Sequence, residues 1–154
     1  MAKPTTCYIG LGSNLGEPRQ QLDRACGALS QLPASEFIRC SSYYTTKAIG
    51  PGSQPDYQNA VAELASALSP LELLDQLQRI EQSQGRQRSV RWGARTLDLD
   101  LLLYGQLSLD SDRLTLPHPR LHERRFVLEP LLEIAPQLAL PGRGSAAQLL
   151  AKLA

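Results

Sequence analysis

Residues 96–104 read TLDLDLLLY, and this stretch decides how the chain is expected to fold. Polar and apolar side chains alternate at its start, as they do in a β-strand whose two faces meet different surroundings. Leu97, Leu99 and Leu101 are expected to point into a core, with Asp98 and Asp100 on the opposite face. We therefore predict a strand over Thr96–Tyr104 that carries acidic side chains on its open face.

A helix with a clear start precedes this strand. Ser69-Pro70-Leu71-Glu72 is a capping box with proline at the first helical position. Apolar residues then recur at helical spacing, and Gly85 supplies a stop. The other predicted elements are strands over Thr6–Leu11, Phe37–Tyr44 and Tyr57–Ala65, a helix beginning at Pro18, and short helices over Val127–Ile134 and Ala146–Leu153.

The order of these elements indicates the fold class. Strand, helix, strand, strand, helix, strand is the order of a ferredoxin-like α+β sandwich. We expect a mainly antiparallel sheet with helices packed on one face and the other face available for a ligand. No linker divides the chain, so a single domain over residues 1–154 is predicted.

Bulk composition is typical of a soluble globular protein. Of the 154 residues, 42% are hydrophobic and 20% are charged, and the formal net charge is +1. Proteins that coat nucleic acid carry a larger excess of bases, so no nucleic-acid partner is expected. There is no signal peptide and no apolar run near the ~20 residues of a membrane span. These features predict a cytoplasmic protein, with no membrane partner, that works as a monomer.

The cysteines do not form a metal-binding or redox motif. Cys7, Cys26 and Cys40 are odd in number, and none of them forms a Cys-x-x-Cys pair. The chain therefore offers neither a zinc knuckle nor a thioredoxin motif. Cys7 and Cys26 lie among apolar residues, and we expect buried, reduced thiols there.

An arginine-rich segment directly precedes the acidic strand. Residues 86–95 read RQRSVRWGAR, with four arginines, one tryptophan and no acid. The planar guanidinium suits phosphate oxygens, and tryptophan can cover an adenine or stack on a guanidinium. A solvated basic loop is the alternative.

The acidic pair suggests a metal site. Side chains two apart on a strand share a face, with Cα atoms roughly 6.5–7 Å apart. Asp98 and Asp100 should therefore repel each other unless a cation lies between them. Magnesium fits best, because it is held by one or two carboxylates together with substrate phosphates and water. Two solvated aspartates on an exposed edge are the alternative.

A second basic cluster follows the strand and comprises Arg113, His118, Arg120, His122, Arg124 and Arg125. His118 could hydrogen-bond a phosphate. Arg124 stands near Phe126, and a cation beside a ring suits a nucleotide or another heterocycle. The alternative is a solvated basic face.

Three glycines near the start imitate a dinucleotide-binding motif. Gly10, Gly12 and Gly16 follow a strand and precede a helix, but the third glycine is one place too late. We expect these glycines to allow a tight turn at the edge of the sheet.

Several motifs together resemble those of the 6-hydroxymethyl-7,8-dihydropterin pyrophosphokinase family. The most specific is Arg91-Trp-Gly-Ala-Arg-Thr-Leu-Asp-Leu-Asp100. The others are Ile9-Gly-Leu-Gly-Ser-Asn14, Gln54-Pro-Asp-Tyr-Gln-Asn59, Arg79-Ile-Glu81 with Gly85-Arg86, and Leu116-Pro-His118. The resemblance spans about Cys7 to Leu140. It implies a ferredoxin-like fold and transfer of pyrophosphate from ATP to the hydroxymethyl pterin in folate biosynthesis, with AMP released.

The resemblance also implies roles for matching residues. Asp98 and Asp100 would hold two Mg²⁺ ions that bridge the ATP phosphates. A mobile catalytic loop would contain Arg86, Arg88, Trp92 and Arg95, with Arg95 nearest the transferred group. The nucleotide site would be lined by Gln78, Glu81, Leu101, Arg113, Thr115, His118 and Arg124.

For the pterin, the resemblance implies a sandwich between Tyr57 and Phe126. Asn59 would read the amide edge of the ring, and Thr46 and Ile49 would line its pocket. Flat heterocycles need such stacking surfaces together with a few fixed hydrogen bonds.

The chain departs from the family pattern in three places. The stretch between Arg88 and Arg91 is one residue short, Ala94 replaces the usual proline, and Pro119 stands where an aromatic residue is common. None of these changes touches the acidic pair.

The sequence leaves two alternative functions to compare with this one. RNA-recognition domains can share the fold, but the aromatic block on which they stack bases is missing and only 5% of residues are aromatic. A ferredoxin-like kinase that acts on another alcohol is harder to separate by pattern, and Tyr57 with Asn59 favours the pterin.

Overall fold

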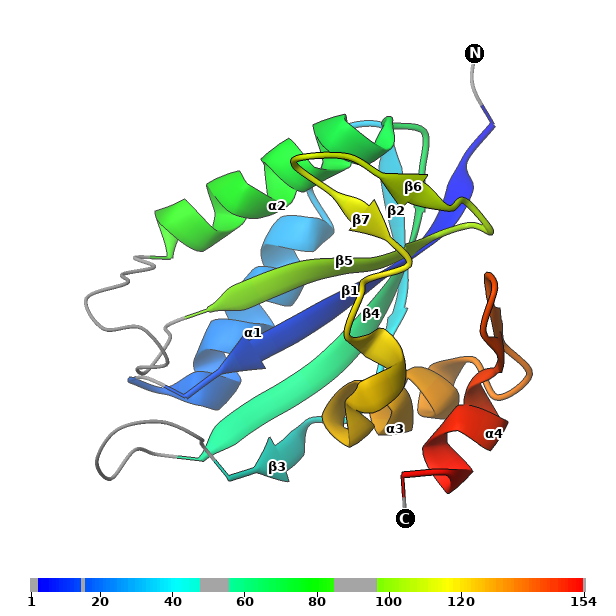
Figure 1. Cartoon of the computed structure of the whole chain (residues 1–154). Helices are drawn as coiled ribbons and strands as arrows, with labels where there is room; N and C mark the ends of the chain where they lie inside the picture. The colour runs from blue at the N-terminus through cyan, green and yellow to red at the C-terminus, as the bar shows by residue number, and fades with distance from the viewer. Residues whose placement is uncertain (1–2, 15, 48–55, 85–96, 154) are drawn as a thin grey trace.

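One antiparallel sheet forms the centre of the molecule (Figure 1). The computed structural model describes residues 3–14, 16–47, 56–84 and 97–153. The strand order is β2-β4-β1-β5, and β3 also pairs with β4. The strands are β1 (Thr5–Ser13), β2 (Ser35–Cys40), β3 (Tyr44–Thr46), β4 (Tyr57–Ser66) and β5 (Asp98–Tyr104). Every pairing in this sheet is antiparallel, which confirms the predicted α+β class.

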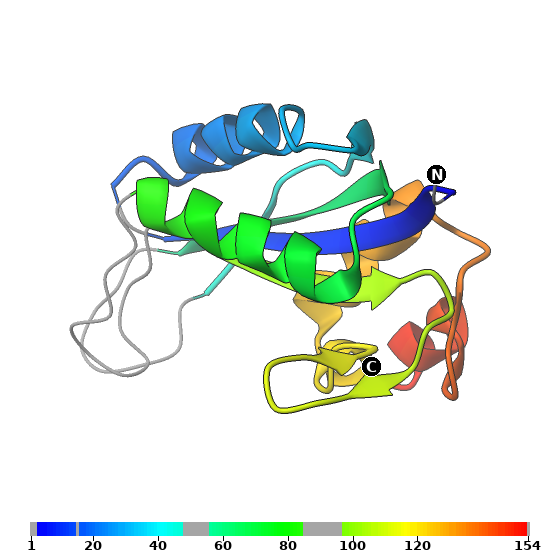
Figure 2. The same ribbon diagram turned by 90° about the horizontal axis from the view of Figure 1, so that it is seen from above.

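Helices α1 (Pro18–Leu29) and α2 (Pro70–Ser83) cover one face of the sheet (Figure 2). The predicted capping box is present, because Ser69 Oγ accepts from Glu72 N at 3.2 Å and Glu72 Oε1 accepts from Ser69 N at 2.9 Å. Fully buried Leu73 and Leu77 place the inner side of α2 in the core. Leu97, Leu99 and Leu101 reach the same core, as expected.

The second face is not left open along its whole length. Helices α3 (Arg125–Ile134) and α4 (Ala146–Ala151) lie on this side (Figure 2). They build a second core on Tyr8, Val61, Leu102 and Leu103. The expectation of helices on one face therefore holds for α1 and α2. α3 and α4 cover the other face, because the apolar strand residues there must also be buried. The smaller elements of this region are β6 (Leu109–Asp110), β7 (Thr115–Leu116), a 3₁₀ helix at Leu121–Glu123, β8 (Ala139–Leu140) and β9 (Gly144–Ser145).

An irregularity in β5 divides its outer face into a polar half and an apolar half. Tyr8 pairs with Leu103 and Ile9 with Leu101, so Leu102 has no counterpart on β1. A bulge of this kind shifts the alternation of side chains. Leu101 therefore joins the first core, while Leu102 and Leu103 both join the second. The acidic pair lies on the half that α3 and α4 leave uncovered.

The strand predicted over Phe37–Tyr44 is divided in two. β2 ends at Cys40 and β3 begins at Tyr44. Buried Ser41 lies between them, and its hydroxyl accepts from Val61 N at 3.0 Å. A side chain thus takes the place of a backbone acceptor, which lets the chain bend while Val61 stays paired.

The three thiols are free, as expected. Cys7 is buried, but Cys26 and Cys40 are only half-buried, with 3.8 Å between their sulfur atoms. Among the described helices, none is long and apolar enough to cross a bilayer.

Candidate active site

Two glycines in the centre of the sheet leave space beside the acidic pair. In the β1–β5 register, Gly10 lies opposite Asp100 and Gly12 opposite Asp98. Residues opposite one another in a sheet present their side chains to the same face, so no side chain on β1 crowds either carboxylate. The expectation that these glycines form an edge turn is wrong, because β1 is an inner strand; Gly16, with φ +69°, is the one in a turn conformation.

Asn59 lies on the other side of Gly12. The two residues are paired across β1 and β4, and a Cβ at Gly12 would stand 3.1 Å from Asn59 Oδ1. Asn59 is 7% exposed, and its Nδ2 donates to Thr46 Oγ1 at 2.8 Å. Thr46 is in turn paired with Tyr57. A single row across the sheet thus carries Asp98, the bare Gly12 and an amide whose orientation is fixed.

The acidic strand is held at its outer edge by helix α2. Glu81 is 6% exposed, and its Oε2 accepts from Leu99 N at 2.8 Å. Leu99 lies between the two aspartates, so this carboxylate fixes the backbone from which both project. In this structure Glu81 contacts the strand, whereas the resemblance implied a contact with nucleotide.

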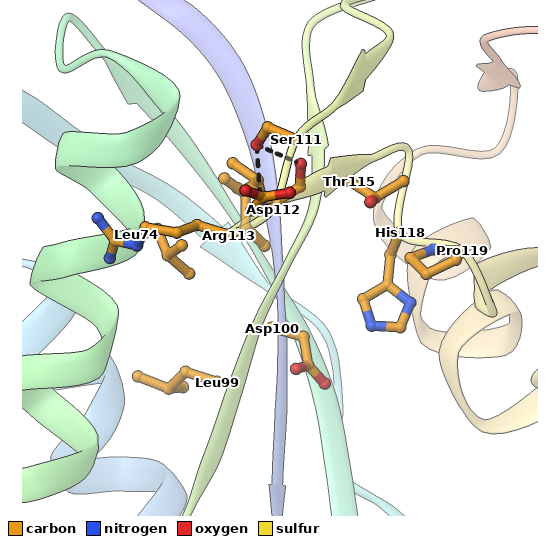
Figure 3. A pocket seen from close by; sticks show the side chains of 11 residues that line it. Leu74, Leu99, Asp100, Ser111, Asp112, Arg113, Thr115, His118 and Pro119 are labelled. Atoms are coloured by element: carbon orange, nitrogen blue, oxygen red, sulfur yellow. Dashed lines mark hydrogen bonds between the residues drawn. The ribbon is translucent and has the colours of Figure 1, made fainter.

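A cavity of about 260 Å³ opens beside Asp100, between β5, α2 and the β6–β7 loop (Figure 3). Four residues predicted for the nucleotide site line it: Leu101, Arg113, Thr115 and His118. Ser111, Asp112 and Pro119 also line it, and no sequence pattern pointed to the first two. The guanidinium of Arg113 is paired with Asp75 on α2 at 2.5 Å, and both side chains are about half exposed (50% and 49%).

His118 is fixed next to Asp100 by two backbone contacts. Its backbone N–H donates to Leu102 O at 2.9 Å, and its ring Nδ1 accepts from Arg120 N at 3.2 Å. A neutral ring with Nδ1 as acceptor carries its proton on Nε2. Burial lowers the pKa of His118, Asp100 acts to raise it, and Arg124 and Arg120 add to the lowering. The net shift is downward, so at neutral pH His118 is a neutral hydrogen-bond donor.

Arg124 and Phe126 stand at the start of α3. The Arg124 guanidinium carbon lies 5.6 Å from the centre of the Phe126 ring, and the ring is 37% exposed. The two residues are thus in contact, as their nearness in sequence suggested, and Phe126 keeps exposed surface.

The other predicted site residues are placed less directly. Gln78 is exposed on α2 and does not line the cavity beside Asp100. Arg86, Arg88, Trp92, Arg95 and Ile49 lie outside the described residues. The position of Gly10 and Gly12 inside the sheet was not predicted. Their spacing of two within an apolar segment nevertheless indicates a strand with one face bare of side chains.

The acidic pair fits magnesium by its chemistry. Asp98 and Asp100 offer only oxygen donors, and the glycines opposite them leave room that a Cβ would occupy. Within the described ranges, no group of three or more His, Cys, Asp and Glu side chains is placed to bind a metal. A two-carboxylate site completed by phosphate oxygens and water is the usual form for this ion.

Comparisons with known proteins agree with this site. The profile of the family described as 7,8-dihydro-6-hydroxymethylpterin-pyrophosphokinase (HPPK) matches residues 8–136. A 2-amino-4-hydroxy-6-hydroxymethyldihydropteridine pyrophosphokinase of Haemophilus influenzae is 56% identical over 136 residues, which is 88% of this chain and 85% of that protein. Its namesake from Pseudomonas aeruginosa is 49% identical over 144 residues, with 94% and 89% covered.

Solved structures show the same fold. The chain matches an HPPK-DHPS structure in complex with substrates with a TM-score of 0.76 at 11% identity, and covers 98% of its own length but 43% of that longer chain. The Plasmodium falciparum HPPK-DHPS structure with pterin and p-hydroxybenzoate gives a TM-score of 0.76 at 12% identity, with 99% and 43% covered. At this identity the solved structures show a shared fold alone, whereas the family profile and the sequence relatives show common ancestry. The chain belongs to the 7,8-dihydro-6-hydroxymethylpterin-pyrophosphokinase family.

Proposed function

We propose that this chain transfers pyrophosphate from ATP to the hydroxymethyl group of 6-hydroxymethyl-7,8-dihydropterin, giving AMP and the pterin diphosphate in folate biosynthesis. One observation carries the proposal: Asp98 and Asn59 occupy one face of the sheet, with only the bare Gly12 between them. The sheet thereby places carboxylates that suit a metal-bound polyphosphate next to an amide that suits the edge of a heterocycle. The names of the sequence relatives fit this pairing of substrates.

The two substrates would occupy opposite ends of this face. ATP would lie toward the cavity beside Asp100, where Leu101, Arg113, Thr115 and His118 line the wall. The pterin would lie over Gly12, against Tyr57 and Phe126 as stacking surfaces, with Asn59 and Thr46 as polar partners. From the resemblance we add Gln78, Glu81 and Arg124 on the nucleotide side, Ile49 on the pterin side, and Arg86, Arg88, Trp92 and Arg95 as the catalytic loop.

Asp98 and Asp100 would hold magnesium, and we propose two ions. When bound, magnesium supplies positive charge against the polyphosphate. Glu81 holds the backbone between the two carboxylates through Leu99 N. The burial and proton position of His118 let it donate from Nε2 to a phosphate oxygen without placing a further charge in the site.

The reaction proceeds by in-line displacement at the β-phosphorus. A bond forms from the pterin hydroxyl oxygen to this phosphorus, the bond to the α-phosphate oxygen breaks, and AMP leaves. The hydroxyl proton passes to a carboxylate of the acidic pair. Arginine side chains of the catalytic loop would meet the charge that develops on the transferred group.

AMP formation that depends on both substrates tests the proposal. Asp98→Ala and Asp100→Ala should each abolish turnover with magnesium and ATP. Glu36→Ala is the control, because Glu36 is an exposed acid on β2, at the opposite end of the strand order from β5. Near-normal rates in either acidic-pair variant would refute the metal assignment. Retention of RNA in a filter-binding assay, without pterin-dependent AMP release, would favour a binding module instead.

A further inference from the structure

Glu133, in the last turn of α3, holds the segment that leads into β3. Its Oε1 accepts from Tyr44 OH at 2.6 Å. Its Oε2 accepts from Ser42 N at 2.8 Å and from Ser42 Oγ at 3.0 Å. One carboxylate thus receives three hydrogen bonds from two residues that lie 91 and 89 positions away in the sequence.

The held segment is also tied to α1, because Tyr43 OH donates to Asp23 Oδ1 at 2.5 Å and the Tyr43 ring centre lies 5.3 Å from the Arg19 guanidinium carbon. β3 contains three residues and pairs only with β4 among the described strands. Its side-chain links to β4 are Thr45 Oγ1, which accepts from Gln58 Nε2 at 2.7 Å, and Thr46 Oγ1, which accepts from Asn59. The second link fixes the amide that we assign to the pterin edge. A displacement of β3 would therefore release Asn59.

The same helix also carries the other wall of the site. α3 has Phe126 in its first turn and Glu133 in its last. Pro130 lies between them, and fully buried Leu128 and Leu131 anchor the helix to the sheet. The hydrogen bonds of Glu133 to Ser42 and Tyr44 add a direct link from this helix to the Thr46–Asn59 wall.

We infer that Glu133 is a positioning residue for pterin binding, which acts through Tyr44, Ser42 and β3 and makes no contact with either substrate. The inference rests on the proposed function, since it assigns the pterin to this wall. At neutral pH the group is charged: burial acts to raise the pKa of Glu133, but hydrogen bonds from Tyr44 and Ser42 outweigh it and the net shift is downward. The same hydrogen bond raises the pKa of its donor, Tyr44, to about 12.

Glu133→Ala with Glu129→Ala as its control tests the inference. Glu129 lies one turn earlier on α3 and forms an ion pair with Arg125 at 3.2 Å within the same helix. Glu133→Ala should raise KM for the pterin about tenfold, as for the net loss of one to two hydrogen bonds, with KM for ATP unchanged. Glu133→Gln, which keeps one acceptor oxygen, should recover part of the loss. Glu129→Ala should leave both KM values unchanged.

A measurement independent of turnover separates this inference from the proposed function. Exchange of the β3 amide hydrogens that are bonded to β4 should accelerate in Glu133→Ala and not in Glu129→Ala. If the acidic-pair variants keep full activity, the proposed function fails while the exchange experiment still reports on β3. Equal KM values and equal exchange in the two variants would overturn the positioning role. If Glu133→Ala does not fold, Tyr44→Phe removes one donor, and about a threefold rise in pterin KM is then required.

Discussion

His118 shows how one residue can be tuned by its immediate neighbours. Its backbone N–H and its ring Nδ1 each form one hydrogen bond with the backbone, and the half-buried ring interacts electrostatically with one carboxylate and two guanidinium groups. The charges oppose one another, because Asp100 favours the protonated imidazole while Arg120 and Arg124 disfavour it. Burial decides the balance in favour of the neutral ring.

These opposing effects predict the outcome of two NMR titrations of His118. Without nucleotide or magnesium, the pKa of His118 should lie below the ~6.5 of an unperturbed imidazole. In Asp100→Asn it should fall further, because the group that raises it is gone. The chain has two histidines, so His122→Gln completes the assignment and leaves His118 as the single reporter. An unchanged or higher pKa in Asp100→Asn would show that Asp100 does not act on this ring.

Contacts between near neighbours in sequence were the most predictable part of the site. Arg124 and Phe126 are two positions apart and do stack. Asp98 and Asp100 share a face because a strand alternates. In contrast, the hydrogen bonds of Glu133 to Ser42 and Tyr44 cross most of the chain, and no local pattern marks them. The hydrogen bond from Leu99 N to Glu81 was also not predicted, because the two residues lie 18 positions apart.

Among the elements, β1 determines the shape of the site by the side chains it lacks. Gly10 and Gly12 both face the open side, but their surroundings differ. The nearest atoms to a Cβ at Gly10 would be those of the Leu102 side chain, at an ordinary 3.4 Å, whereas at Gly12 it would stand 3.1 Å from Asn59 Oδ1. The Asn59 amide is held by Thr46 and has little freedom to move away.

Gly12→Ala should therefore weaken pterin binding more than Gly10→Ala. Displacement of the Asn59 amide loses about one hydrogen bond, and we expect a rise in pterin KM of roughly tenfold. Gly10→Ala should change this KM less than about threefold, since its new methyl group meets a movable leucine. Steady-state kinetics with the pterin varied at saturating ATP measure both effects. Equal KM values in the two variants would show that the pterin does not occupy the space over Gly12.

The elements themselves were predicted well where a local signal starts or stops them. The capping box placed the start of α2, and alternation placed β5. The break between β2 and β3 was missed, because it depends on the contact between Ser41 and Val61 of another strand. The bulge at Leu102 was also missed, since three consecutive leucines carry no sign of which face each will take.

At the scale of the whole molecule, two hydrophobic cores lie on opposite faces of one sheet. The first contains Ile9 and Leu11 of β1, and the second contains Tyr8 of the same strand. β4 and β5 likewise contribute to both cores. The C-terminal helices were predicted, but the face they cover was not, because both faces of these strands are apolar at that end of the sheet.

Shared strands imply that the two cores unfold together, which would support the predicted single domain. Leu77 of α2 and Leu131 of α3 are both fully buried, one in each core. Leu77→Ala and Leu131→Ala should each lower the free energy of unfolding by about 2–5 kcal/mol, the cost of a buried leucine-to-alanine change. Denaturant unfolding followed by far-UV circular dichroism and by tyrosine fluorescence should give one coincident transition in both variants. If Leu131→Ala instead splits the transition and shifts only one part of it, α3 and α4 form a unit that separates from the sheet. The site would then lose its Phe126 wall before its acidic pair, because Phe126 belongs to α3 and the aspartates to β5.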